Sequence, residues 1–473
     1  MPIKPLLCSA AALWLLSGCS MAPNPEITPP ALPDGNVSVG TSASSAALDA
    51  RWWEGFRDGT LNALVQEALR HNDDLKIAAS RVAQAAASLG YSRAERYPTI
   101  DAGASAYRQQ TSSETLSPFS GFTYNSFDLS VSAAYEFDFW GRYKNLEASA
   151  RAQLIATEAD RETVRIGLIA GVAELYFNLV SLKRQIAVTE ATVQAFKESY
   201  EYRSRQFSHG VIDALTLQQS HALYATAKVA LAGLREERLL AENALGILLG
   251  RSPKAMLAPA YETAAALPEP LTVPSELTSS LLERRPDILA AEARLRSANA
   301  AIGVAKAAYF PTISLTGTAG YSSTEFDRLM NSSAQFWGFG PSLYVPLLDF
   351  GRIKNNVEEA EAKKDEAVTV YAQTVRTAFK EVYDALARLR ASHKKADAQD
   401  EANGALEKVL TLSQKRFDSG YGTYLEVIDA KKALLASRLN LVRLNAELVT
   451  NQISLYKALG GGWKRPEGEE ATP

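Results

Sequence analysis

The chain contains four stretches in which apolar and polar residues alternate, the pattern of a β-strand with two different faces. The clearest extends from Phe127 to Phe139, a second from Thr312 to Tyr321, and weaker ones begin at Ile100 and Phe339. Aromatic residues lie near the ends of these long runs, as in transmembrane β-barrels, although a half-buried soluble sheet gives the same alternation. Four strands cannot close a barrel and an open edge cannot lie in lipid, so a membrane sheet here requires several chains to pool their strands.

Long helical stretches occupy much of the remaining sequence. Tyr143–Phe207 contains no proline and would form roughly 95 Å of helix if unbroken. Its second part has apolar residues spaced three and four apart, which is typical of coiled-coil packing. The run Ile353–Phe417 has the same spacing of apolar residues. The last helix, Leu425–Tyr456, has two apolar seams. A helix with two apolar seams can pack against a neighbouring helix on each side, as in a closed cylinder of helices. The alternative interpretation is a solvated helical bundle.

One helix-to-strand joint occurs twice. Arg81–Ile100 aligns with Arg294–Ile313 at an offset of 311 − 98 = 213, which pairs Pro98 with Pro311. Proline disfavours helix for the residue before it, so each helix should end at the aromatic–proline pair. The Gly-Arg pairs after the strands and the turns after the long helices repeat at an offset of 210. The sequence therefore predicts two copies of one unit of helix, two strands and two helices.

Each long helix is followed by a short turn and a returning helix. Gly210 and Gly420 are expected to adopt the left-handed conformation that ends a helix. Asp213 and Thr423 are expected to cap the returning helices. The long helices should therefore form hairpins whose tips lie far from the strands.

The N-terminus has the features of a targeting segment. The apolar run Leu6–Leu16 is too short to span a membrane as a helix, and we expect residues 1–18 to be a signal peptide. The following Cys19 completes what looks like a bacterial lipobox, in which this thiol takes a lipid and becomes the first residue. Ser20 is compatible with delivery to the outer membrane. The lipid on Cys19 is the only bound group that we expect, and we expect no cofactor.

Composition excludes several classes of function. The net charge of −3 does not indicate a nucleic-acid partner, and the two cysteines cannot build a disulfide framework. Neither a phosphate-binding loop nor a nucleophile elbow is present, so we do not expect an enzyme. None of the four histidines shows metal-site spacing. A metal site formed by His209 and His221 would suggest metal efflux, but the two histidines are twelve residues apart across a turn, which argues against such a site.

Several motifs together carry a resemblance to a known family. The lipobox, Trp52-Trp53, the two Pro-Thr-Ile joints and the closing segment Leu455–Trp463 resemble those of TolC-like outer-membrane factors, and most of all the lipoprotein branch serving RND-type multidrug efflux pumps. The resemblance implies a homotrimer of mixed α and β class. Its four strands per chain would build a twelve-stranded transmembrane β-barrel, and its helices a long periplasmic α-barrel.

The same resemblance implies a function and its partners. The trimer would be the passive exit duct of a tripartite pump, lipid-anchored in the outer membrane, with a large periplasmic part. An RND-type inner-membrane transporter would supply energy, and a periplasmic adaptor would join the two. By resemblance, the adaptor docks at the hairpin tips, which are Gly210, Val211, Gly420 and Tyr421.

The resemblance also places an acidic aperture near the second tip. Glu426 and Asp429 fall at the positions where the family has acidic rings, three residues apart on one helical face. Threefold symmetry would make two rings of like charge that favour cations. A solvated helix face is the alternative. Thr216 and Gln219 occupy the equivalent places in the first repeat, so a salt-bridge lock on that hairpin is not expected.

Two other functions remain open from the sequence. One is a duct for protein secretion, and the other is a periplasm-spanning structural lipoprotein without a pore. The alternating strands argue against the structural lipoprotein, since a lipoprotein without a pore does not require membrane strands.

We divide the chain into a signal peptide and five further segments. These are a lipid-anchored tether with a short helix at 19–72, a first repeat at 73–250 with strands at about 98–140, a linker at 251–276, a second repeat at 277–460 with strands at about 311–348, and a tail at 461–473.

Overall fold

The computed structural model describes residues 21–23, 37–38, 50–114, 120–256, 267–268, 276–277 and 285–463. The signal peptide, Cys19 and most of residues 20–49, of the linker and of the tail lie outside these residues. The chain divides into two compact units. The sheet unit contains Val82–Thr157 and Ala291–Tyr371, and the hairpin unit contains Pro29–Arg81, Glu158–Ala290 and Ala372–Pro473.

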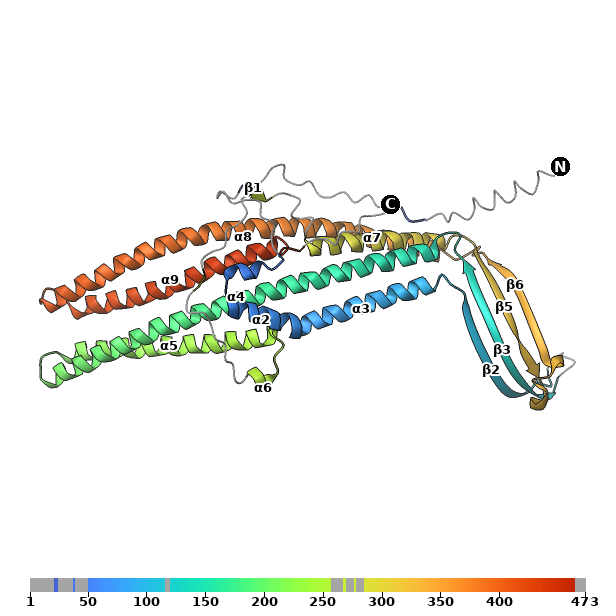
Figure 1. Ribbon diagram of the computed structural model, residues 1–473, viewed down its shortest axis with the longest axis horizontal. Coiled ribbons are helices and arrows are strands. Elements are labelled where there is room, and N and C mark those ends of the chain that lie inside the picture. Colours follow the sequence, from blue (N-terminus) through green and yellow to red (C-terminus); the bar gives the residue numbers. More distant parts are fainter. Residues whose placement is uncertain are drawn as a thin grey trace. The chain divides into compact units, whose positions relative to one another are not determined.

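The sheet unit is built on one antiparallel sheet of four strands in the order β2-β3-β5-β6 (Figure 1). The strands are β2 (Thr99–Gln110), β3 (Thr123–Phe137), β5 (Thr312–Ser323) and β6 (Gln335–Tyr344). The central pair joins the two repeats, with Ala133 opposite Gly317. The outer strands β2 and β6 each have one edge without a partner strand in the described chain.

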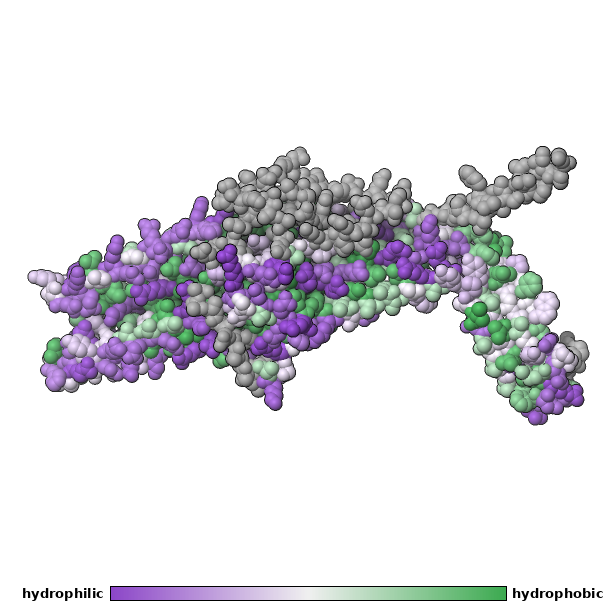
Figure 2. Space-filling model, viewed as in Figure 1, coloured by the Kyte–Doolittle hydropathy of each residue, from purple (hydrophilic) through white to green (hydrophobic). Residues whose placement is uncertain are grey.

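The two faces of this sheet differ as the alternation predicts. Large apolar side chains on one face are exposed in the single chain: Ile100, Leu129, Val131, Leu315, Trp337, Phe339 and Leu343. Small polar residues and glycine dominate the other face, where Asp128 accepts hydrogen bonds from Ser105, Ser126 and Ser322 across three strands. Figure 2 shows hydrophobic and neutral residues over much of the visible side of the sheet, with hydrophilic ones at its loop end.

Both predicted helix-to-strand joints are present. Helix α3 (Asp73–Ala94) ends before Pro98 and leads into β2, and α7 (Pro286–Ala307) ends before Pro311 and leads into β5. The fourth strand lies earlier in the chain than predicted, since it begins at Gln335 and not at Phe339. It ends at Tyr344, because Pro346 has no N–H to donate to a ladder.

One helical hairpin follows the strands of each repeat. The first consists of α4 (Arg142–Ser208) and α5 (Ala214–Leu248), and the second of α8 (Arg352–Asp418) and α9 (Tyr424–Ala458) (Figure 1). The long helices α4 and α8 each contain 67 residues, so the glycines at 167 and 171 do not break α4. The short elements are η1 (Trp52–Phe56), α2 (Gly59–His71), α6 (Pro253–Met256), η3 (Phe326–Arg328), η4 (Ser332–Ala334) and a two-residue pairing of β1 (Val37–Ser38) with β4 (Glu276–Leu277).

The segment around Trp52-Trp53 is anchored in the core of the hairpin unit. Trp52 stacks on Tyr456 with ring centroids 5.2 Å apart, and Phe56 contacts Phe177 at 5.0 Å. The Tyr176 hydroxyl donates to Asp58, the residue that caps α2. Both tryptophans are buried in this core.

One described helix, α4, is long and apolar enough to cross a membrane. About two thirds of its most apolar window is buried inside the chain, as in the core helix of a globular protein. Length and hydropathy alone are therefore weak evidence for a membrane span by this helix.

Candidate functional site

The two hairpin tips have nearly identical backbones. Gly210 has φ 68° and Gly420 has φ 78°, the left-handed conformation predicted for both. The next residues close the turns, because the amides of Val211 and Tyr421 donate to carbonyls five residues earlier, each at 2.9 Å. Both side chains are exposed, Val211 by 66% and Tyr421 by 83%. Each tip therefore presents one apolar or aromatic side chain on a rigid turn, and its docking role stays a prediction.

The predicted caps of the returning helices are confirmed. The Asp213 carboxylate accepts from the Thr216 amide at 2.8 Å, and hydrogen bonds from Thr216 hold the pKa of Asp213 below its usual value. Thr423 forms a capping box with Glu426, whose carboxylate accepts from the Thr423 amide. In both turns a side chain of the cap accepts a hydrogen bond from a free amide in the first turn of the helix, which fixes where the returning helix begins.

The two predicted aperture carboxylates differ in their surroundings. Glu426 serves the capping box, and its carboxylate lies 3.7 Å from the Arg416 guanidinium. Asp429, almost one turn further along α9, is exposed and has no hydrogen-bond or ionic partner among the described residues. The charge of Glu426 is therefore partly balanced within the chain, whereas Asp429 presents its full charge to solvent.

A cation–π cluster near the tips was not predicted. Arg203 of α4 is buried, and its guanidinium lies 4.8 Å from the ring centroid of Phe417 and 4.5 Å from that of Tyr424. The Tyr424 hydroxyl also lies 3.2 Å from that of Ser199. These contacts join the first hairpin to the second. The signal was present in the sequence, since Arg203 continues the apolar seam of α4 three residues after Tyr200.

The histidines of the first hairpin show no metal-site geometry. The ring of His221 packs against Tyr200, with centroids 4.9 Å apart. Within the described part of the chain, no group of three or more histidine, cysteine, aspartate or glutamate side chains is arranged to hold a metal ion.

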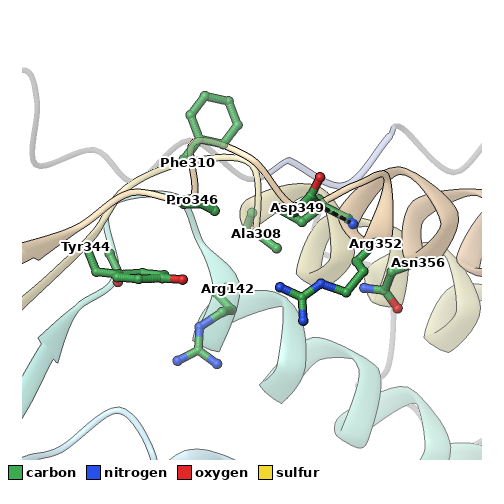
Figure 3. Close-up of a pocket in the computed structure, with 11 residues that line it drawn as sticks. Arg142, Ala308, Phe310, Tyr344, Pro346, Asp349, Arg352 and Asn356 are labelled. Atoms are coloured by element: carbon green, nitrogen blue, oxygen red, sulfur yellow. Dashed lines mark hydrogen bonds between the residues drawn. The ribbon is translucent and has the colours of Figure 1, made fainter.

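The sheet unit has an open cavity of about 510 Å³ beside the second helix-to-strand joint (Figure 3). Phe310, Tyr344 and Pro346 line it together with Arg142 and Arg352, which lie at the starts of α4 and α8. The Arg352 side chain extends toward the cavity, whereas that of Arg142 points away from it (Figure 3). Arg142 is held by two hydrogen bonds to one Glu136 oxygen and one to the other. The repeated Gly-Arg pairs thus place both arginines at the base of the sheet.

Comparison with known proteins identifies the family. The outer membrane efflux protein family matches residues 64–251 and 277–461. The chain belongs to this family. The cation efflux system protein CusC of Escherichia coli K12 is 34% identical over 453 residues, covering 94% of this chain and 97% of CusC.

Two further relatives agree with this assignment. The solvent efflux pump outer membrane protein SrpC of Pseudomonas putida is 36% identical over 471 residues, covering 96% of this chain and 97% of SrpC. The crystal structure of the outer membrane channel CmeC of Campylobacter jejuni matches with a TM-score of 0.89 at 25% identity, covering 96% of each chain.

Family membership settles the fold class and the location. The chain is a subunit of a trimeric outer membrane efflux channel, in which the sheets of three copies close one transmembrane barrel and the helices form the periplasmic part. The predictions of pooled strands and of an efflux duct are confirmed, and the structural-strut alternative is wrong. The two unpaired edges β2 and β6 are what a barrel shared between copies requires.

Proposed function

We propose that this channel is the passive exit duct of a tripartite pump, fed by a periplasmic adaptor and an RND-type inner-membrane transporter. One observation supports this proposal most directly. In a chain of the efflux family, a sheet with one apolar face and one face of small polar residues continues directly into two long helical hairpins. The names of the relatives specify different cargoes, cations for CusC and solvents for SrpC. We therefore place the choice of cargo mainly in the transporter and assign small molecules, rather than proteins, to this duct.

The adaptor is proposed to dock on the exposed side chains of the tips. Val211 and Tyr421 extend from turns whose glycines are open, since a Cβ added at either glycine would have no atom within 4 Å. A partner can therefore approach the backbone closely. Replacing both Val211 and Tyr421 with Asp should prevent docking, because burying an unpaired charge in a contact is costly.

The experiment expresses the chain with a cognate RND transporter and adaptor in a host lacking its own outer-membrane factors. We expect drug resistance with the unchanged chain and loss of resistance with V211D/Y421D. The matched control is V229D, because Val229 is 73% exposed on α5 away from the tip. Trimer mass is measured for each variant. Resistance that persists in trimeric V211D/Y421D would contradict docking at the tips, and export of a protein substrate without drug resistance would favour a secretion duct.

The lipid on Cys19 is part of the same proposal. One acyl-bearing anchor would add membrane affinity to that of the barrel. Mass spectrometry of the mature N-terminal peptide should find a diacylglyceryl-modified Cys19. An N-terminus beginning at another residue would contradict lipidation.

A further inference from the structure

The two arginines that begin the long helices have different partners. In the first repeat, the Arg142 guanidinium donates three hydrogen bonds to the Glu136 carboxylate. In the second repeat, the Arg352 side chain forms no hydrogen bond or ion pair within the described part of the chain. The sequence explains the difference, because Pro346 stands at the place of Glu136, since 346 − 210 = 136. Arg352 therefore lacks the carboxylate that its counterpart has.

The strand register supports this equivalence of the two repeats. Thr312 of β5 lies opposite Tyr344 of β6, and the corresponding Thr99 of β2 lies opposite Ala134 of β3. The proline and the glutamate each come two residues after the second member of their pair, and each arginine follows six residues later. The backbone thus offers both arginines the same place for an acidic side chain, and only the first repeat supplies one.

The cavity of about 510 Å³ at the second joint lies beside Arg352 (Figure 3). Its volume is within the range of small-molecule sites. Phe310, Tyr344 and Pro346 line it with their rings, and the Arg352 side chain extends toward it. Asn356, one turn further along α8, also lines the cavity and offers a neutral amide donor on the same side of the helix. The cavity therefore combines an apolar wall with a cation and an amide.

Asp349 also lines the cavity, but its carboxylate is engaged by the backbone. One oxygen accepts from the Gly351 amide at 3.0 Å and the other from the Ile353 amide at 2.8 Å, so Asp349 caps the start of α8. A guanidinium in the first turn of a helix meets the positive end of the helix dipole, where anions and not cations are stabilised. An anionic ligand therefore explains the position of Arg352 better than helix stability does.

The cavity lies on the face of the sheet that carries small polar residues. The Ser314 and Ser342 hydroxyls are 2.7 Å apart on this face. Thr312 and Tyr344, which line the cavity, come two residues nearer the helices on the same strands and so share that face. In the trimeric channel, the opposite, apolar face contacts lipid. The cavity therefore faces the channel interior, at the level where the barrel meets the helices.

We propose that this cavity is a binding site for a small carboxylate with an apolar body. The carboxylate of the ligand takes the place at Arg352 that Glu136 takes at Arg142. Its apolar part lies against Phe310 and Tyr344. Three such sites in the trimer would retain anionic amphiphilic cargo on its way through the duct. The inference rests on the proposed function for the passage of cargo, but binding itself requires neither an adaptor nor a transporter.

Equilibrium binding to the purified trimer in lipid nanodiscs tests the site. The probe is 1-naphthoate, and 1-naphthamide is the neutral control of similar shape. Calorimetry corrected with empty nanodiscs should show saturable naphthoate binding with one site per chain. The amide should bind at least about tenfold more weakly, the usual effect of losing a hydrogen bond between charged groups.

Two outcomes of this measurement would overturn the proposal. Equal affinity for the two probes would mean that the Arg352 charge does not recognise the ligand. Absence of naphthoate binding would mean that Arg352 has another partner in the trimer, such as a carboxylate of the next copy. The drug-resistance assay is independent of both results, so either failure would leave the proposed function in place.

Three variants assign the binding to the cavity. R352Q should weaken naphthoate binding at least about tenfold. P346E should weaken it as well, because the new carboxylate pairs with Arg352 inside the chain. K354Q is the matched control and should bind normally, since Lys354 is exposed in the same helical turn and pairs with Glu358. Trimer mass is measured for each variant. A trimeric R352Q that binds naphthoate like the unchanged chain would contradict the site.

Discussion

At the residue scale, the two carboxylates that we predict at the aperture have different environments. Glu426 closes a capping box and lies near Arg416, whereas Asp429 is exposed. Three copies around one axis would place six carboxylates near the opening. Asp429 should therefore contribute more of the fixed negative charge than Glu426, a difference that the sequence alone does not reveal.

The first prediction concerns ion selectivity. Replacing Glu426 and Asp429 with Ala should lower the preference of single channels for cations over anions, because rings of negative charge attract cations. The measurement is the reversal potential in planar bilayers under a salt gradient. D429N alone should produce most of the change. A reversal potential that stays the same in the double variant would remove the acidic ring without affecting the fold.

The second prediction concerns two glycines with the same backbone conformation. Gly250 has φ 66° and Gly210 has φ 68°, but a Cβ at Gly250 would collide with the His71 carbonyl, whereas Gly210 is open. G210A should cost about 1 kcal/mol, from the left-handed conformation alone. G250A should cost more than about 3 kcal/mol, because backbone must also shift. Melting followed by circular dichroism measures both; equal melting temperatures would contradict this packing.

At the element scale, the duplication preserves contacts rather than residue types. In the first repeat, the side-chain amide of Asn72 donates to the carbonyl of Leu248 at 2.9 Å. In the second repeat, Arg285 and Ala458 occupy the corresponding positions, and the Arg285 guanidinium donates to the Ala458 carbonyl at 2.8 Å. Each residue ties the first helix of its repeat to the end of its returning helix. Arg285 also binds Asp287 and Glu381, a charged cluster that the first repeat lacks at this place.

The third prediction concerns pH and the contact between α2 and the segment after α5. Arg251 donates to both carboxylate oxygens of Glu67 at 2.6 and 2.8 Å, and this hydrogen bonding lowers the pKa of Glu67. A depressed carboxyl pKa stabilises the fold above the unfolded value of about 4.3, and this stabilisation is lost as the pH falls through the folded value.

The measurement compares the melting temperature of E67Q with that of the unchanged chain at several pH values. We expect E67Q to melt lower at neutral pH and the difference to disappear in acid. E190Q is the control, because the Glu190–Arg235 pair is exposed and should contribute little. A difference that is independent of pH would contradict the ionic contribution of Glu67.

At the scale of the whole molecule, the sequence predicted those structural features that depend on residues close together in the chain. The joints at Pro98 and Pro311, the left-handed glycines at 210 and 420 and the four strands follow from period, proline and glycine, which act on near neighbours. The sequence did not predict which side chains meet across elements. The spacing of α4 places Arg203 on its apolar seam, but it does not reveal that Phe417 and Tyr424 of the second hairpin are the rings that Arg203 contacts.

The assembly of several copies was predictable because a single chain cannot pair all of its strand edges or cover its apolar sheet face. Two sheet edges are unpaired in the described chain, and an apolar sheet face is exposed. Each requirement is met by further copies of the chain. The predicted docking tips and the lipid on Cys19 depend on molecules outside the chain, so they await the experiments given above.

The most direct test of the central claim is electron microscopy of the detergent-extracted protein together with its mass from light scattering. The account predicts three chains per particle and class averages with threefold symmetry around an open central channel. A monomer, or an assembly that stays in solution without detergent and shows no channel, would mean that the four strands do not build a shared membrane barrel.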